Sequence, residues 1–217
     1  MTPMVNQNEI LRYLGASTTN DTLDALISRA REAVEKAMRP RHLVQHISLQ
    51  VDAPLETVIL AGTPLPSRDL AQHLQGCQEG FLFACTLGPD IDALVKRYTL
   101  TEPAMLPVIQ AVAAAYTESY ADEAQRPLEG YAQERGLYLR PRYSPGYGDF
   151  ALHYQRFLFD ALEISKRIGV TLTEDFIMIP FKSVTAVIGL SSDPSLCHIN
   201  KCMTCTAKNC PFRKEAE

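Results

Sequence analysis

The hexapeptide R-Y-S-P-G-Y, residues 142–147, is the stretch from which this chain can be interpreted. It lies within residues 138–150, which contain too many prolines and glycines for a regular helix or strand. Pro145 restricts one backbone position and Gly146 frees the next, so the main chain can approach a ligand closely. Arg142 offers a planar fork that matches a carboxylate, and Tyr147 offers an electron-rich ring for a cation. We therefore expect a shaped binding loop. Composition alone also fits a surface turn with an exposed arginine.

Two further segments follow this loop closely. They are G-V-T-L-T-E at residues 169–174 and M-I-P-F-K-S-V at residues 178–184. Each motif alone carries little information, but the ordered set R-x-x-P-G-Y, G-V-x-L-T-E and M-x-P-x-x-S-V is specific. Over roughly residues 80–192 the chain resembles the S-adenosylmethionine-binding activation domains of cobalamin-dependent methionine synthases.

The resemblance implies roles for individual residues. Arg142 matches the arginine that holds the carboxylate of S-adenosylmethionine, and Tyr147 matches the tyrosine near the transferred methyl group, the one position assigned to catalysis. Glu174 matches a family glutamate, although a residue at a helix-to-strand junction explains it equally well. The other implied cofactor contacts are Ser144, Pro145, Gly146, Ile188 and Gly189. The family's acidic residue for the cofactor amino group has no identifiable counterpart near the N-terminus.

Two acidic residues lie outside the motifs. Glu118 and Asp122 lie one turn apart on an expected helix, so they share a face that a ligand could meet. Charges on helices more often point to solvent, and we expect that here.

The pattern of apolar residues predicts an α+β fold. Helical spacing covers residues 21–38, 103–135 and 152–167, whereas alternation or buried apolar runs predict strands at 43–51, 57–61 and 80–87. Strand-forming residues at 176–190 are interrupted by Pro180. Because these elements follow no regular βαβ period, we expect a twisted antiparallel sheet with flanking helices rather than a Rossmann fold.

Composition limits the classes of function. The 217 residues are 46% hydrophobic and 21% charged, as in an ordinary globular protein, with a net charge of −4 that argues against nonspecific nucleic-acid binding. No apolar run reaches the ~18 residues of a membrane span, and the polar N-terminus is no signal peptide, so we expect a cytoplasmic protein.

We divide the chain into three parts. Residues 1–80 are a helix and strand part of the same body, residues 80–192 are the cofactor-binding core, and residues 193–217 are a cysteine-rich tail.

The tail carries a second candidate site. Four cysteines spaced C-x4-C-x2-C-x4-C predict one metal centre, because clustered thiolates can wrap a single zinc ion or a [4Fe–4S] cluster. Unrelated cysteines or disulfides are the alternative, which is uncommon in the cytosol. An electron-transfer role favours iron–sulfur over redox-inert zinc. The expected ligands are Cys197, Cys202, Cys205 and Cys210.

The resemblance also implies a function and partners. It suggests an activation subunit that acts in trans on a cobalamin-binding methionine synthase chain lacking its own activation domain. The subunit would bind S-adenosylmethionine for reductive methylation of cob(II)alamin on that partner, with flavodoxin or ferredoxin as electron donor. The alternatives are a reductive activator of another corrinoid methyltransferase, or a non-catalytic metal-binding assembly module.

Overall fold

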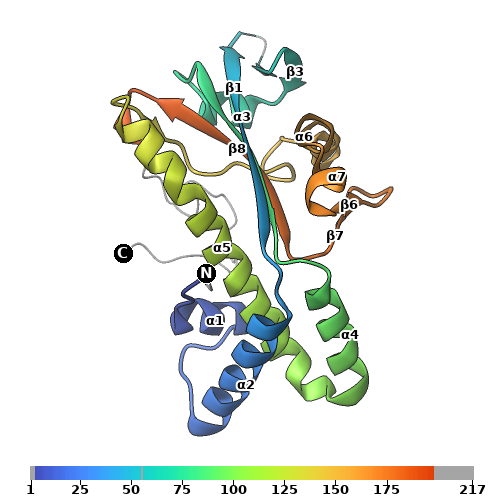
Figure 1. Cartoon of the computed structure of the whole chain (residues 1–217). Helices are drawn as coiled ribbons and strands as arrows, with labels where there is room; N and C mark the ends of the chain where they lie inside the picture. The colour runs from blue at the N-terminus through green and yellow to red at the C-terminus, as the bar shows by residue number, and fades with distance from the viewer. Residues whose placement is uncertain (1–2, 55, 198–217) are drawn as a thin grey trace.

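A twisted antiparallel sheet of six strands forms the centre of the molecule in a computed structural model, which describes residues 3–54 and 56–197 (Figure 1). The strand order is β3-β2-β1-β4-β8-β5, and every neighbouring pair is antiparallel. Their bounds are β1 Arg41–Asp52, β2 Thr57–Leu60, β3 Thr63–Pro66, β4 Glu79–Thr86, β5 Tyr138–Leu139 and β8 Ser183–Ser191. The α+β prediction is therefore confirmed.

Strand β4 lies at the middle of this sheet. Each of its residues pairs with β1 on one side and with β8 on the other. Burial on both faces explains why residues 79–86 are an almost continuous apolar run. Gly80 lies opposite Gly189 of β8, and a Cβ at Gly80 would collide with the carbonyl oxygen of Ile188. The two strands therefore approach closely where the cofactor contacts are expected.

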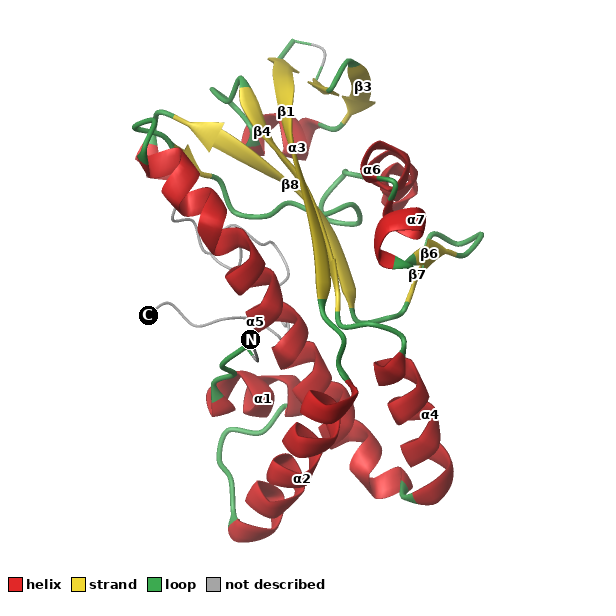
Figure 2. Cartoon of the chain, in the orientation of Figure 1, coloured by secondary structure: helices red, strands yellow, loops and turns green. Residues whose placement is uncertain are grey.

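Helices cover the two faces of the sheet differently (Figure 2). The long α5, Leu106–Gln133, packs small residues such as Ala121 and Ala124 against Phe81 and Ile188 on one face. The opposite face is covered by α3 Arg68–His73, α6 Gln155–Leu162 and α7 Ile164–Ile168.

A helical lobe extends beyond one end of the sheet. The first half of α5 packs there with α1 Gln7–Leu14, α2 Asp21–Ala37 and α4 Asp90–Thr101. Alanine-rich α5 thus belongs to both the lobe and the sheet, which makes it the element that joins them. Among the described residues, no helix combines the length and the apolar character that crossing a membrane requires.

The structure differs from the sequence prediction at several element boundaries. The helix expected at 152–167 is two helices, α6 and α7, because Glu163 adopts a left-handed conformation with φ 51° between them. The strand-forming residues 176–190 are interrupted at Pro180, as the sequence indicated, which separates β7 Met178–Ile179 from β8. β7 forms a small hairpin with β6 Thr171–Leu172.

Candidate functional site

The Arg142 loop is attached directly to β8. The backbones of Tyr143 and Val187 exchange two hydrogen bonds, of 2.9 and 2.8 Å, and the Arg140 amide donates to the Gly189 carbonyl at 2.8 Å. These bonds extend the pairing of β5 with the end of β8. The loop therefore runs beside Ile188 and Gly189, which brings together two of the segments that the sequence motifs indicated.

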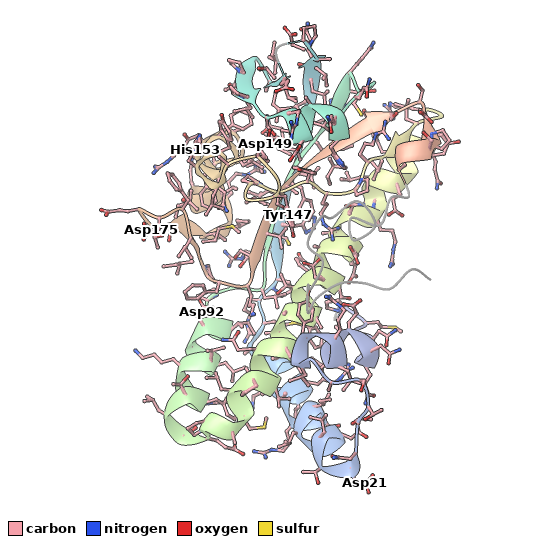
Figure 3. All side chains as sticks on the ribbon, turned by 180° about the vertical axis from the view of Figure 1, so that it is seen from behind. Asp21, Asp92, Tyr147, Asp149, His153 and Asp175 are labelled. Atoms are coloured by element: carbon pink, nitrogen blue, oxygen red, sulfur yellow. The ribbon has the colours of Figure 1, made fainter. Side chains whose placement is uncertain are left out.

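A tight turn then presents Tyr147. The amide of Tyr147 donates to the Ser144 carbonyl at 3.2 Å, and the amide of Gly146 donates to the Phe150 carbonyl at 2.7 Å. Gly146 has φ 97°, a conformation that favours glycine, and Pro145 beneath it is buried. The Tyr147 side chain remains 54% exposed. Figure 3 labels it near the middle of the molecule, where the loop crosses the sheet.

Asp149 fastens the end of the loop to the start of α3. Its carboxylate accepts hydrogen bonds from Ser67 Oγ at 2.5 Å and from the amides of Arg68 and Asp69 at 2.9 and 3.1 Å. In turn, the Asp69 carboxylate accepts a hydrogen bond of 3.1 Å from the Asp149 amide. Burial opposes ionisation of Asp149, but these donors outweigh it and lower the pKa of the carboxyl.

Arg142 points from the loop to α5 and meets three acceptors there. Its Nη2 lies 2.7 Å from Asp122 Oδ1 and 3.4 Å from Glu118 Oε2, and its Nη1 donates to Gln125 Oε1 at 3.0 Å. The side chain is only 14% exposed, and its guanidinium carbon lies 6.0 Å from the centre of the Phe83 ring. One cation and two carboxylates therefore gather at one spot between α5 and the loop.

Glu118 and Asp122 are solvent-exposed, as expected, with 46% and 70% of their side chains accessible, but both also pair with Arg142. Their spacing of four residues places both on the side of α5 that faces the loop, and Arg142 draws them together. The i,i+4 spacing was the available signal. The sequence could not show which residue stood opposite, because that depends on how the loop pairs with β8.

The thiol behind this cluster is not a reactive group. Cys85 on β4 is buried, and burial raises its pKa to about 12 despite the nearby Arg142. A thiol with such a pKa remains protonated at neutral pH. Cys85 and the equally buried Cys77 both lie in the core, as the apolar sequence around them indicates.

Glu174 does not join the other motif residues. It is exposed in the turn between β6 and β7, a hairpin that projects on the side of the sheet away from α5 (Figure 1). Asp175 beside it is labelled at the far edge of the molecule in Figure 3. A hollow of about 380 Å³ lined by Arg156, Asp160, Lys166 and Thr171 also lies near this hairpin. Neither feature contributes to the Arg142 cluster.

The cysteine tail is described only at its first ligand candidate. Cys197 is half-buried, and its thiol donates to the Asp193 carbonyl at 3.4 Å. Cys202, Cys205 and Cys210 lie outside the described residues. Within residues 3–54 and 56–197, no group of three potential metal ligands comes together.

Comparison with known proteins identifies the family. Residues 71–214 match the family model described as "Vitamin B12 dependent methionine synthase, activation domain". A crystal structure described as the MetH reactivation domain bound to AdoHcy superposes with a TM-score of 0.62 at 18% sequence identity. The match covers 87% of this chain and 70% of that one. No curated protein sequence matches the chain.

Proposed function

Because the chain belongs to the vitamin B12-dependent methionine synthase activation-domain family, we propose that its Arg142 loop binds S-adenosylmethionine for reductive methylation of cob(II)alamin on a partner protein. The observation that carries this proposal is the meeting of Arg142 with Glu118 and Asp122. A cation beside two carboxylates complements the α-amino acid end of the ligand, which bears one charge of each sign.

Binding at this cluster is an exchange of partners. The ligand carboxylate takes the Nη1 and Nη2 donors of Arg142, and the ligand ammonium takes the carboxylates of Glu118 and Asp122. The ligand adds one charge of each sign, so the cluster keeps one excess negative charge both with and without ligand, and every cation has an acidic partner in both states. These two acids supply the amino-group contact that the sequence motifs did not reveal.

The position of Tyr147 fits transfer to an acceptor on another protein. Its exposed ring lies in the turn that follows Arg142, so the sulfonium end of the ligand faces outward rather than into a closed cavity. S-adenosylmethionine supplies the methyl cation and a reductant supplies one electron, leaving methylcobalamin and S-adenosylhomocysteine. Arg142 and Tyr147 orient the donor, and the chain thereby serves as a component of methionine synthase. The proposed cofactor contacts remain Ser144, Pro145, Gly146, Ile188 and Gly189. Glu174, exposed in the turn between β6 and β7, does not lie with them and stays a proposal of the family resemblance alone.

We also propose that the cysteine-rich tail, residues 193–217, holds a metal centre. Four closely spaced thiolates suit zinc or a [4Fe–4S] cluster, and only the cluster can pass the electron that this reaction requires. Flavodoxin or ferredoxin is the proposed donor in the cytoplasm. The proposed ligands are Cys197, Cys202, Cys205 and Cys210.

Calorimetry tests the binding proposal. S-adenosylmethionine and S-adenosylhomocysteine should both bind the wild-type protein, because both carry the α-amino acid group. Methylthioadenosine lacks that group and should bind far more weakly. Absence of binding of the first two ligands at millimolar concentration would refute the proposal. Capture of the partner from a native extract then distinguishes a methionine synthase chain from another corrinoid protein.

A further inference from the structure

The Arg142 cluster contains one partner that carries no charge. Gln125 lies on α5 three residues after Asp122, and its Oε1 accepts a hydrogen bond of 3.0 Å from Arg142 Nη1. The side chain of Gln125 is half-buried. Glu118 and Asp122 lie instead at the other terminal nitrogen, Nη2, at 3.4 and 2.7 Å. The guanidinium therefore has a neutral acceptor at one nitrogen and two anionic acceptors at the other.

The two nitrogens of Arg142 differ in how readily a ligand carboxylate can reach them. A carboxylate that approaches Nη2 meets two like charges, and repulsion at such distances is strong enough to determine orientation. A carboxylate that approaches Nη1 displaces only an amide oxygen. The new hydrogen bond joins two charged groups and is stronger than the one it replaces. The ligand carboxylate should therefore enter from the Nη1 side.

The opposite end of the cluster suits a cation. Glu118 and Asp122 leave one negative charge in excess of that on Arg142. Helix α1 packs against α5 at this end, and it places Tyr13 near Glu118. Burial raises the pKa of Tyr13, and the nearby charge of Glu118 adds to that rise. The ligand ammonium should therefore lie toward Glu118 and α1, and the ligand carboxylate toward Gln125.

The amide of Gln125 can serve the cluster in two states. It combines an acceptor oxygen and two N–H donors in one planar group. Without ligand, Oε1 accepts from Arg142. A half-turn about the last torsion angle of the side chain, which has two broad minima, brings Nε2 to the same place. The amide then donates to a carboxylate that has taken Nη1, whereas a glutamate side chain could only repel it.

We propose that Gln125 is a specificity-determining residue, which admits the ligand carboxylate to Arg142 and fixes the orientation of the α-amino acid group. This inference rests on the S-adenosylmethionine site of the proposed function. Gln125 yields Nη1 to the carboxylate and donates to it, while Glu118 and Asp122 hold the ammonium. The site thereby selects ligands that carry both charges over ligands that carry the ammonium alone.

Gln125→Glu tests the proposal with two ligands measured by calorimetry. Decarboxylated S-adenosylmethionine lacks the carboxylate and retains the sulfonium and the ammonium. The substitution changes the size of the side chain little and adds a third acid at Arg142. Affinity for S-adenosylmethionine should fall by about 10- to 100-fold, because repulsion replaces a charge-assisted contact. Affinity for the decarboxylated ligand should stay the same or rise, a divergence that a disturbed fold cannot produce.

Two further variants serve as controls. Gln133→Glu adds the same charge at the exposed last residue of α5 and should leave both affinities within about twofold of the wild-type values. Gln125→Ala removes the amide without adding a charge. It should weaken S-adenosylmethionine by about 2- to 10-fold, the range of one hydrogen bond, and should affect the decarboxylated ligand less.

The possible results separate this inference from the site on which it rests. Parallel changes of the two affinities in Gln125→Glu would overturn the proposal and restrict Gln125 to the support of Arg142. The S-adenosylmethionine site would survive that result, since the wild-type protein would still bind its ligand. A wild-type protein that binds neither ligand would refute the site itself, and with it the role of Gln125.

Discussion

Arg142 is the residue on which the proposed ligand site depends. In the proposed complex it anchors the ligand carboxylate, and in the structure it pairs with both Glu118 and Asp122, one positive charge beside two negative ones. Replacing it should affect binding twice, because the ligand carboxylate loses its partner and lies near two carboxylates that only the ligand ammonium then balances.

We expect Arg142→Ala to lower the affinity for S-adenosylmethionine by about 30- to 160-fold, which corresponds to 2–3 kcal/mol, as for other buried charge-assisted contacts. Calorimetry measures the affinity, and circular dichroism verifies that the fold is retained. Arg126→Ala is the matched control, since Arg126 is exposed on the same helix. An affinity within twofold of the wild-type value would show that Arg142 is not the carboxylate anchor.

Tyr147 is the residue expected to contact the sulfonium. Tyr147→Phe keeps the ring and should retain most of the affinity for S-adenosylmethionine. Tyr147→Ala should lose about 2- to 30-fold, the range of a cation–π contact of 0.5–2 kcal/mol. S-adenosylhomocysteine is the control ligand because it has no positive sulfur, so its affinity should change less. Equal losses for both ligands would assign the ring to packing rather than to the cation.

At the scale of elements, the attachment of the loop to α3 determines where Arg142 and Tyr147 lie. Asp149 caps α3 through its carboxylate, so the loop is restrained at this end as well as at β8. Gly148 permits the close approach, since a Cβ there would collide with the Asp69 carboxylate. Figure 3 shows Asp149 and Tyr147 on the same short stretch of chain.

This attachment should depend on pH in a defined direction. The pKa of Asp149 is lowered in the folded protein, so its stabilising effect is complete above its ordinary pKa of about 3.9 and is lost as the pH falls further. We therefore expect hydrogen exchange in residues 142–150 to be slow and constant between about pH 5 and 8, after correction for the intrinsic rate. Exchange should become faster below about pH 4. Asp149→Ala should exchange rapidly even at neutral pH. If that variant matches the wild-type protein, the cap does not restrain the loop.

The elements differ in how far the sequence could predict them. Residues 79–86 and 106–133 were recognisable because a buried strand and a small-residue helix have strong local patterns. The short α3 was missed because its six residues give no clear period, although Ser67 is a typical cap. The prolines and glycines of residues 138–150 predicted the Arg142 loop, although Tyr138 and Leu139 at its start form the strand β5. The contacts of Arg142 with Glu118 and Gln125 arise from tertiary pairing, for which a single sequence carries no local signal.

At the scale of the whole molecule, the family match and the folded unit do not coincide. The match begins at residue 71, within α3. Yet β1 lies between β2 and β4 in the sheet, and α2 packs on the first half of α5. Leu43, Ile47 and Leu49 of β1 belong to the same core as α6 and α7. The first 70 residues are thus continuous with the rest in both the sheet and the helical lobe.

A fragment of residues 71–217 should therefore fail to fold, although it contains every recognised motif. Strand β4 would lose its whole pairing with β1, and α5 would expose the apolar surface that α1 and α2 cover. We expect an aggregating or non-cooperative protein in circular dichroism and thermal unfolding. A second fragment, residues 1–197, lacks the tail after Cys197. In the absence of metal it should unfold near the temperature of the full-length protein, and it should still bind S-adenosylmethionine. Cooperative unfolding of 71–217 would show that the sheet can close without β1, and binding of S-adenosylmethionine by that fragment would place the complete ligand site within the family match.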